Sequence, residues 1–216
     1  MKNLLRFICL FILIYSCSSS KNHSYFDENN VEIDKRKYNK RKHSGELLGI
    51  KIDSSKLKLT TREKRGILNN MPKFVETLEA GLNTTLDNNK PIVIIFYPGE
   101  DPCNSNGVTN KECYKQLEDG LQQVAKTKPL YIYKDAKGLE NYDGLLEWKQ
   151  DPNQFIENLF FKYHYPCNSF VVISSKGDYI SYFGEFPEEF LWEAAQILKW
   201  FLLYFLSFWT YVKNLH

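Results

Sequence analysis

The stretch from Lys90 to Cys113, KPIVIIFYPGEDPCNSNGVTNKEC, limits the possible folds of this chain more than any other segment. It begins with Pro91–Tyr97, a continuous apolar run rich in Ile, Val, Phe and Tyr. A short apolar run without alternation is typical of a strand that is covered on both faces. Such strands lie in the middle of an α/β sheet, so we predict an α/β domain built around this strand.

A cysteine-bearing loop and a helix are predicted directly after this strand. The apolar run breaks at Pro98-Gly99, and the polar loop that follows holds Cys103. Thr109 and Glu112 have the spacing of a capping box, which marks the start of a helix. Cys113 then falls in the first helical turn, where the helix dipole favours a thiolate. The cysteine chemistry of this domain is therefore expected at the end of the central strand.

The first 16 residues have the composition of a signal peptide. Lys2 and Arg6 form a charged end, and the apolar core FICLFILIY at Phe7–Tyr15 is too short to span a membrane. The segment ends in Ile14-Tyr15-Ser16-Cys17, which resembles the lipobox of bacterial lipoproteins. That resemblance implies lipidation of Cys17 and a membrane-anchored protein of the bacterial cell envelope, facing the periplasm or the exterior. An ordinary secretory signal is the alternative.

Residues 17–46 are predicted to be a flexible, lipidated tether, because they are mainly polar and show no apolar period. Within them Lys35–Lys42 is strongly basic, and we favour a solvated linker over attraction to anionic lipid or another acidic envelope polymer. The whole chain has 28 Lys+Arg and 26 Asp+Glu, and loss of Lys2 and Arg6 with the signal makes these numbers equal. Overall charge gives no reason to expect nucleic-acid binding.

Residues 47–200 are predicted to form one domain of alternating strands and helices. Strands are expected at Leu47–Asp53, Lys56–Thr60, Pro91–Tyr97 and Pro129–Tyr133, and in a hairpin of Ser169–Ser174 with Tyr179–Phe183; helices are expected over Met71–Leu86, after the cysteine loop, over Pro152–Tyr163 and from Pro187. The segment Ala136–Gln150 is expected to be mainly a loop. Strand–helix–strand alternation implies parallel pairing through a right-handed crossover.

Over residues 47–200 the chain resembles the thioredoxin-like superfamily. Three features carry the resemblance: KPIVIIFYP before a cysteine loop and helix, the helix Pro152–Tyr163 before the hairpin, and NSFVVISSKG at Asn168–Gly177. The resemblance implies a three-layer α/β sandwich with a central mixed sheet flanked by helices. It also implies a thiol–disulfide oxidoreductase with weak exchange activity.

The chain departs from the pattern of that superfamily at its redox motif. Such oxidoreductases carry Cys-x-x-Cys, whereas the segment Cys103–Asn106 keeps only the first thiol and Asn110–Cys113 keeps only the second. The cis-proline of the superfamily falls at Asn168, and Pro166 lies two residues earlier. A non-catalytic binding module that keeps the fold is therefore the alternative function.

Three cysteines remain after the signal and Cys17 are set aside, namely Cys103, Cys113 and Cys167. The thioredoxin-like layout brings the loop before the hairpin opposite the cysteine loop, so the resemblance places Cys167 near Cys103 or Cys113. In the redox interpretation Cys103 is the nucleophile and Cys113 or Cys167 resolves it. In the structural interpretation the pair is a disulfide that ties down a long loop.

No cofactor and no metal ion is expected. The three cysteines and His164 lack the paired Cys-x-x-Cys spacing of a zinc site. His164 is interpreted as a packed or surface residue, and Glu100-Asp101 as a solvated turn.

The C-terminal tail at residues 201–216 includes most of an unusually aromatic segment. Trp200–Val212, WFLLYFLSFWTYV, is uncharged and too short to span a bilayer as a helix. It is interpreted either as a helix in the membrane interface or as an extension packed on the domain or on a protein partner.

Overall fold

The computed structural model of the chain describes residues 23–105, 111–142 and 144–199. In this part the strands form a four-stranded sheet in the order β2-β1-β4-β3 and a six-stranded sheet in the order β5-β10-β9-β6-β7-β8. The strands are β1 (Ser24–Phe26), β2 (Glu32–Ile33), β3 (Leu47–Lys51), β4 (Lys56–Thr61), β5 (Glu63–Ile67), β6 (Ile92–Tyr97), β7 (Pro129–Tyr133), β8 (Trp148–Gln150), β9 (Ser169–Ile173) and β10 (Asp178–Tyr182). The helices are α2 (Lys35–His43), α3 (Met71–Leu82), α4 (Lys111–Ala125) and α5 (Phe155–Phe160), with a helical segment at residues 188–199 and the 3-10 turns η2 (Leu139–Tyr142) and η3 (Pro152–Gln154).

Strand β6 lies in the interior of the six-stranded sheet, as the unbroken apolar run predicts. It pairs in parallel with β7 and antiparallel with β9, so that Ile95 lies opposite Tyr131 on one side and Phe170 on the other. All of its residues are buried. Because side chains alternate along a strand, Ile94 and Phe96 enter one core cluster, and Val93 and Ile95 enter the other.

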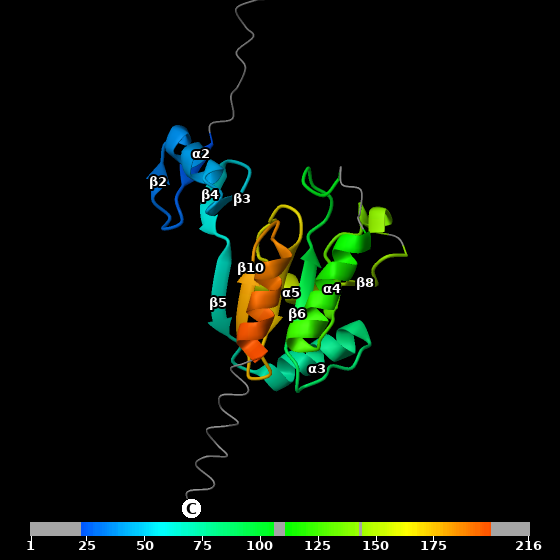
Figure 1. Cartoon of the computed structure of the whole chain (residues 1–216). Helices are drawn as coiled ribbons and strands as arrows, with labels where there is room; N and C mark the ends of the chain where they lie inside the picture. The colour runs from blue at the N-terminus through cyan, green and yellow to red at the C-terminus, as the bar shows by residue number, and fades with distance from the viewer. Residues whose placement is uncertain (1–22, 106–110, 143, 200–216) are drawn as a thin grey trace, which may run out of the picture.

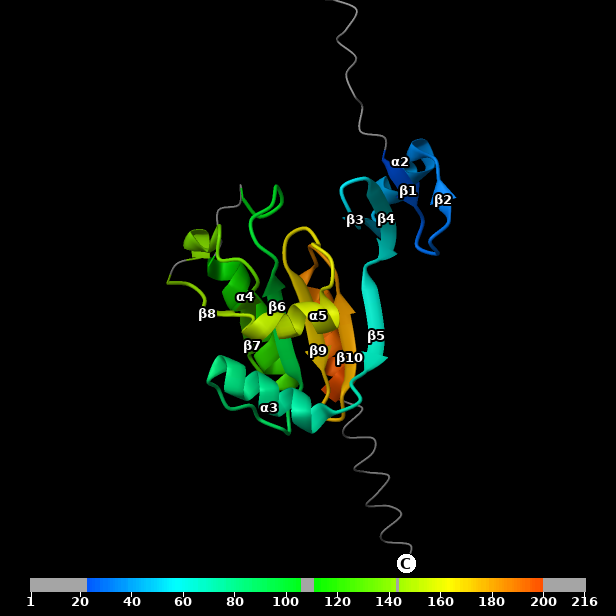
Figure 2. The same cartoon turned by 180° about the vertical axis from the view of Figure 1, so that it is seen from behind.

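Helices cover both faces of this sheet (Figures 1 and 2). On one face α3 and α5 supply Phe74, Leu78 and Ile156 to the core. On the other face α4 and the 188–199 segment supply Leu121 and Leu191. The parallel β6–α4–β7 unit, followed by α5, the antiparallel β9–β10 hairpin and a closing helix, gives the three layers and the strand order of a thioredoxin-like fold. The predicted fold class is confirmed.

The predicted flexible tether at residues 17–46 is wrong for residues 23–46. These residues form β1, β2 and α2, which complete the small sheet with β3 and β4. Their few apolar side chains are enough to hold these elements in place, because the β3–β4 hairpin offers a surface on which they pack. Tyr38 is buried with Leu47 and Leu59, and Tyr25 packs against this cluster. Ile50 of β3 in turn belongs to the core of the large sheet, so both sheets are packed together.

Two further segments differ from expectation. Residues 136–150, expected to be mainly a loop, contain η2 and the edge strand β8. The helix predicted over Pro152–Tyr163 begins only at Phe155, because Asn153 and Gln154 have left-handed backbone angles (φ 53° and 58°). Asp151 still caps it, since its carboxylate accepts the backbone N–H groups that open α5.

Among the helices of the described residues, none has the length and apolar composition needed to cross a membrane.

Several predicted features lie outside the described residues. They are the signal peptide with Cys17, the capping-box residue Thr109 and the aromatic segment Trp200–Val212.

Candidate functional site

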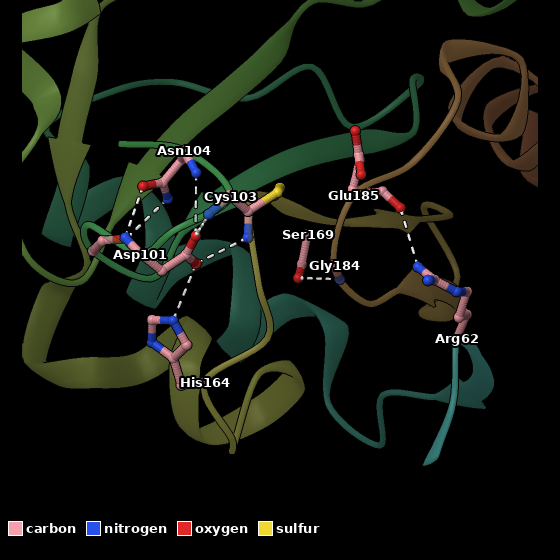
Figure 3. The surroundings of a disulfide bond; sticks show 10 residues. Arg62, Asp101, Cys103, Asn104, His164, Ser169, Gly184 and Glu185 are labelled. Carbon is pink, nitrogen blue, oxygen red and sulfur yellow. Dashed lines mark hydrogen bonds and ion pairs between the residues drawn. A yellow bond between two sulfur atoms is a disulfide. The ribbon is translucent and has the colours of Figure 1, made fainter. Parts of the chain in front are cut away.

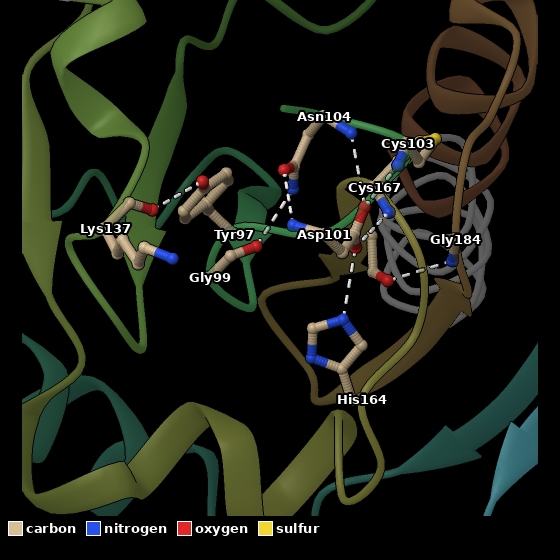
Figure 4. A network of polar contacts seen from close by, with 10 residues as sticks. Tyr97, Gly99, Asp101, Cys103, Asn104, Lys137, His164, Cys167 and Gly184 are labelled. Atoms are coloured by element: carbon tan, nitrogen blue, oxygen red, sulfur yellow. Dashed lines mark hydrogen bonds and ion pairs between the residues drawn. A yellow bond between two sulfur atoms is a disulfide. The ribbon is translucent and has the colours of Figure 1, made fainter. Parts of the chain in front are cut away.

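Three loops meet at the carboxyl end of β6: residues 98–105, residues 164–168 and residues 183–188 (Figures 3 and 4). Cys103 of the first loop and Cys167 of the second form a disulfide across 64 residues of sequence, with their Cα atoms 5.3 Å apart. The prediction that Cys167 lies beside Cys103 or Cys113 is confirmed, and Cys103 is the partner. Cys113 is a free, exposed thiol in the first turn of α4.

The first loop is folded by its own side chains. Asn104 Oδ1 accepts the backbone N–H of Asp101 (2.8 Å), and Asn104 Nδ2 donates to the carbonyl of Gly99 (2.9 Å). The carbonyl of Asp101 accepts the backbone N–H of Asn104 (3.1 Å) and of Ser105 (2.9 Å). This compact turn fixes the direction in which Cys103 leaves the end of β6.

The carboxylate of Asp101 links both halves of the disulfide. Oδ1 accepts the backbone N–H of Cys103 (2.8 Å), and Oδ2 accepts the backbone N–H of Cys167 (2.9 Å). His164 Nε2 lies 3.1 Å from Oδ2, with its ring 49% exposed, whereas the Asp101 side chain is only 7% exposed. The interpretation of Glu100-Asp101 as a solvated turn is therefore wrong for Asp101. His164 is a surface residue, as expected, but it is tied to the disulfide through this carboxylate.

Sequence reasoning overlooked Asp101, although a local signal was present. Asp followed by Pro and then by another residue is a typical Asx-turn sequence, in which the carboxylate accepts the N–H two residues later. That signal explains the bond to Cys103. The bond to Cys167, 66 residues away, arises only from the fold.

Cys167 has an unfavourable backbone conformation. Its φ is 61°, in the left-handed region that residues other than Gly, Asn and Asp rarely adopt. The neighbouring Tyr165 is buried and stacks on Phe183, with ring centroids 4.4 Å apart, and burial raises the pKa of Tyr165 to about 12. The loop is thus anchored in the core on one side of Cys167 and held by Asp101 at Cys167 itself. Such over-determined strain is common at functional sites.

The third loop places a carboxylate next to the sulfur atoms. Ser169 Oγ accepts the backbone N–H of Gly184 (3.0 Å), and Arg62 donates to the carbonyl of Glu185 (3.3 Å), as Figure 3 shows. A carboxylate oxygen of Glu185 and the two sulfur atoms of the disulfide lie within 4.8 Å of one another. In the disulfide form the sulfurs are bonded to each other, so these three groups do not offer the thiolate ligands of a metal site.

A groove of about 400 Å³ runs from the disulfide along α4. It is lined by Ile95, Cys113, Tyr114, Leu117, Cys167, Asn168, Glu185, Phe186 and Glu188. Asn168 Oδ1 and Glu188 Oε2 are buried without a hydrogen-bond partner. Burial raises the pKa of Glu188, and the neighbouring charge of Glu189 raises it further. The groove therefore combines an apolar floor, a disulfide at one end and acceptor oxygens in its wall.

The structure adds to the departures from the redox motif of the superfamily that the sequence shows. No peptide bond in the described residues is cis, so Pro166 does not take the place of the cis-proline. Cys103 and Cys113 do not form a single motif either, because Cys103 is bonded to Cys167. Cys113 lines the same groove as Cys167, which keeps the third thiol close to the site.

Comparison with protein-family models finds no match, and comparison with curated proteins finds none either. Among solved structures, the chain is similar to a secreted thiol-disulfide isomerase from Corynebacterium glutamicum, with a TM-score of 0.34 and 13% sequence identity. The similarity covers 51% of this chain and 71% of that protein.

Proposed function

We propose that this chain is an envelope-anchored thiol–disulfide exchange protein whose redox pair is Cys103 and Cys167. One observation carries the proposal: the disulfide lies at the carboxyl end of the central strand, joins two separate loops and opens onto a groove. Ligands of open α/β sheets bind outside the carboxyl ends of the strands. A target polypeptide in this groove would lie against Cys167, which is bonded to the exposed Cys103.

The chemistry needs only the two sulfurs of the pair and those of the target. In the reduced protein the Cys103 thiolate attacks a target disulfide, forms a mixed disulfide and releases one target thiolate. The Cys167 thiolate then attacks the Cys103 sulfur, which re-forms the internal disulfide and releases the second target thiolate. Two electrons pass from the protein to the target, and the reverse sequence oxidises a target dithiol.

The exposure of the two cysteines supports an assignment of their roles. Cys103 is exposed and Cys167 is half-buried, so Cys103 is the attacking thiol and Cys167 resolves the mixed disulfide. The sequence left Cys113 and Cys167 as alternatives for the resolving role, and the bond to Cys103 favours Cys167. Cys113 stays a groove residue in this proposal.

The alternative function is a non-catalytic binding module in which the disulfide only ties two loops together. The missing Cys-x-x-Cys and the trans peptide at Pro166 favour this alternative. The strained Cys167 and the exposed Cys103 favour exchange, because structural disulfides are normally buried and unstrained.

The anchoring part of the proposal rests on the lipobox-like Ile14-Tyr15-Ser16-Cys17. Lipidation of Cys17 would hold the domain at the membrane of a bacterial envelope. Incorporation of labelled palmitate in the native host tests it: wild type is labelled and Cys17→Ala is not, and equal labelling of the two contradicts the anchor.

Trapping of the mixed disulfide tests the exchange chemistry. Cys167→Ser removes the resolving thiol, so after incubation with a peptide disulfide we expect a stable adduct on Cys103, which mass spectrometry of the non-reduced protein would detect. Cys113→Ser is the matched control and should release its adduct as the wild type does. An adduct on Cys113 in the Cys167→Ser variant, or none on any cysteine, would contradict the assigned roles.

A further inference from the structure

Helix α2 carries charge that the thiol chemistry does not use. It has six Lys or Arg side chains in nine residues, KRKYNKRKH, and no acidic one. The whole chain has a formal net charge of only +2, so the rest of the chain is net acidic. The basic charge is therefore concentrated on one element.

The fold presents this charge to the outside. Tyr38 is the buried residue of α2, and it packs on Leu47 and Leu59 of the small sheet. At about 100° per residue, Arg36 and Lys40 lie on the opposite side of the helix from Tyr38. The exposed cations are Lys35, Arg36, Lys37, Lys40 and Lys42. Figures 1 and 2 show α2 at the outer end of the small sheet, away from the six-stranded sheet.

Neither ion pairing nor helix stability explains these cations. Arg41 is paired with Glu28 at 2.7 Å, but none of the five exposed cations has an ion pair within the described residues. Cations in the last helical turn favour the helix dipole, which accounts for Lys40 and Lys42. Cations in the first turn oppose the dipole, and Lys35, Arg36 and Lys37 are in that turn. Their presence points to a partner with negative charge.

We propose that α2 is a docking surface for an anionic lipid bilayer. A flat, negative surface matches the unpaired cations Arg36, Lys37 and Lys40 on the outer and lateral sides of the helix, and each Lys or Arg held near such a surface strengthens binding about fivefold. Ser24, which begins β1, follows Cys17 by only seven residues, a span of at most ~25 Å. A lipid on Cys17 would therefore keep α2 close to the bilayer, although the charge contact itself requires neither this lipid nor the thiol exchange.

The test measures how the full-length protein partitions onto vesicles of phosphatidylcholine alone and of phosphatidylcholine mixed with phosphatidylglycerol. The ratio of the two partition coefficients isolates the charge contact, because apolar segments bind both kinds of vesicle. The variant Arg36→Gln, Lys37→Gln and Lys40→Gln removes three outward charges and keeps helix propensity. The control variant Lys115→Gln, Lys128→Gln and Lys162→Gln removes three exposed charges from other elements.

We expect the α2 variant to lose about 100-fold of the preference for the anionic vesicles, from three contributions of about fivefold each. The control variant should keep most of this preference for anionic vesicles, and high salt should abolish the preference in the wild type. An equal loss in both variants, or no preference for anionic vesicles in the wild type, would overturn the proposal. Loss of binding to heparin by the α2 variant, with unchanged partition onto vesicles, would also overturn it and indicate a soluble polyanion. Unchanged far-UV circular dichroism of the α2 variant shows that it folds, and trapping on Cys103 in a Cys167→Ser background tests the exchange chemistry separately.

Discussion

At the scale of single residues, Asp101 determines the geometry of the site. Its carboxylate holds the backbones of Cys103 and Cys167, which belong to different loops. A carboxylate that is shielded from water and accepts several N–H groups is costly to remove, because a part-buried donor such as the N–H of Cys167 then loses its partner. Figure 4 shows this residue at the centre of the polar network. Asp101 is thus a positioning residue for the disulfide.

Replacement of Asp101 by Asn tests this role. The Asn amide keeps one acceptor oxygen, but its NH2 group then faces the backbone N–H of either Cys103 or Cys167 and cannot accept a hydrogen bond from it. We expect the free energy of unfolding to fall by about 1–3 kcal/mol, measured by urea denaturation of the oxidised protein.

Asp53 provides a matched control for this substitution. It accepts the backbone N–H groups of Ser55 (2.8 Å) and Lys56 (2.9 Å) in a similar turn, but it is 46% exposed and joins no second loop. Asp53→Asn should cost less than Asp101→Asn, because Asp53 is an exposed surface residue. Equal losses for the two variants would show that Asp101 acts only within its own turn.

The cysteines of the site could be predicted from the sequence, but the hydrogen bonds by which Asp101 holds them could not. Residue type and the thioredoxin-like resemblance together placed Cys167 near Cys103, because the resemblance supplies the approach of distant loops. Asp101 makes its decisive contacts with Cys167 and His164, more than 60 residues away. No local sequence pattern contains those contacts. The sequence around Asp101 therefore indicated only a solvated turn, which is wrong for this residue.

At the scale of elements, the loop and helix before the hairpin depend on Asp151. Its side chain is buried, and its carboxylate accepts the backbone N–H of Ile156 (2.9 Å) and of Glu157 (2.8 Å). Burial raises the pKa of Asp151, while the two hydrogen bonds oppose that rise. The folded state therefore keeps the proton of this carboxyl to a higher pH than the unfolded state does, which makes the fold more stable relative to the unfolded chain at acid pH.

Comparison of wild type with Asp151→Asn across acid pH tests the sign of this effect. The stability contributed by protonation of Asp151 is complete below its ordinary pKa of 3.8 and is lost as the pH rises through the higher folded-state pKa. The free energy of unfolding of wild type minus that of the variant should therefore decrease with pH over this window and then stay constant.

The exposed Asp53 should behave in the opposite way. The hydrogen bonds to Ser55 lower its pKa, so its contribution is present above 3.8 and is lost as the pH falls. The difference between wild type and Asp53→Asn should increase with pH. A difference for Asp151→Asn that also increases with pH would contradict the dominance of burial at that site.

Elements with long apolar patterns were predictable from the sequence, and edge elements were not. Strand β6, helix α3 and the β9–β10 hairpin carry enough buried side chains to show their period. Strands β5 and β8 lie at the edges of the six-stranded sheet and read EKRGI and WKQ. Edge strands commonly carry charges that prevent further pairing, so their sequences resemble loops. Helix α2 was hidden for a similar reason, because Tyr38 is its one buried side chain.

At the scale of the whole molecule, the chain combines a thioredoxin-like layer structure with a second, small sheet. β4 and β5 are separated only by Arg62, so one continuous stretch of chain joins the small sheet to the edge of the large one. The same Arg62 donates to the carbonyl of Glu185 beside the disulfide. The proposed redox end and the proposed lipid-facing helix thus belong to one packed unit.

The reduction potential of the Cys103–Cys167 disulfide tests the central proposal most directly. Equilibration of the full-length protein with glutathione and dithiothreitol buffers, followed by thiol alkylation and mass spectrometry, gives the fraction reduced at each potential. If the pair exchanges disulfides with target proteins, we expect a value within the range of known exchange proteins, about −120 to −270 mV. A value below about −300 mV is typical of structural disulfides. That result would contradict exchange and leave a binding module whose two loops are held together by the bond.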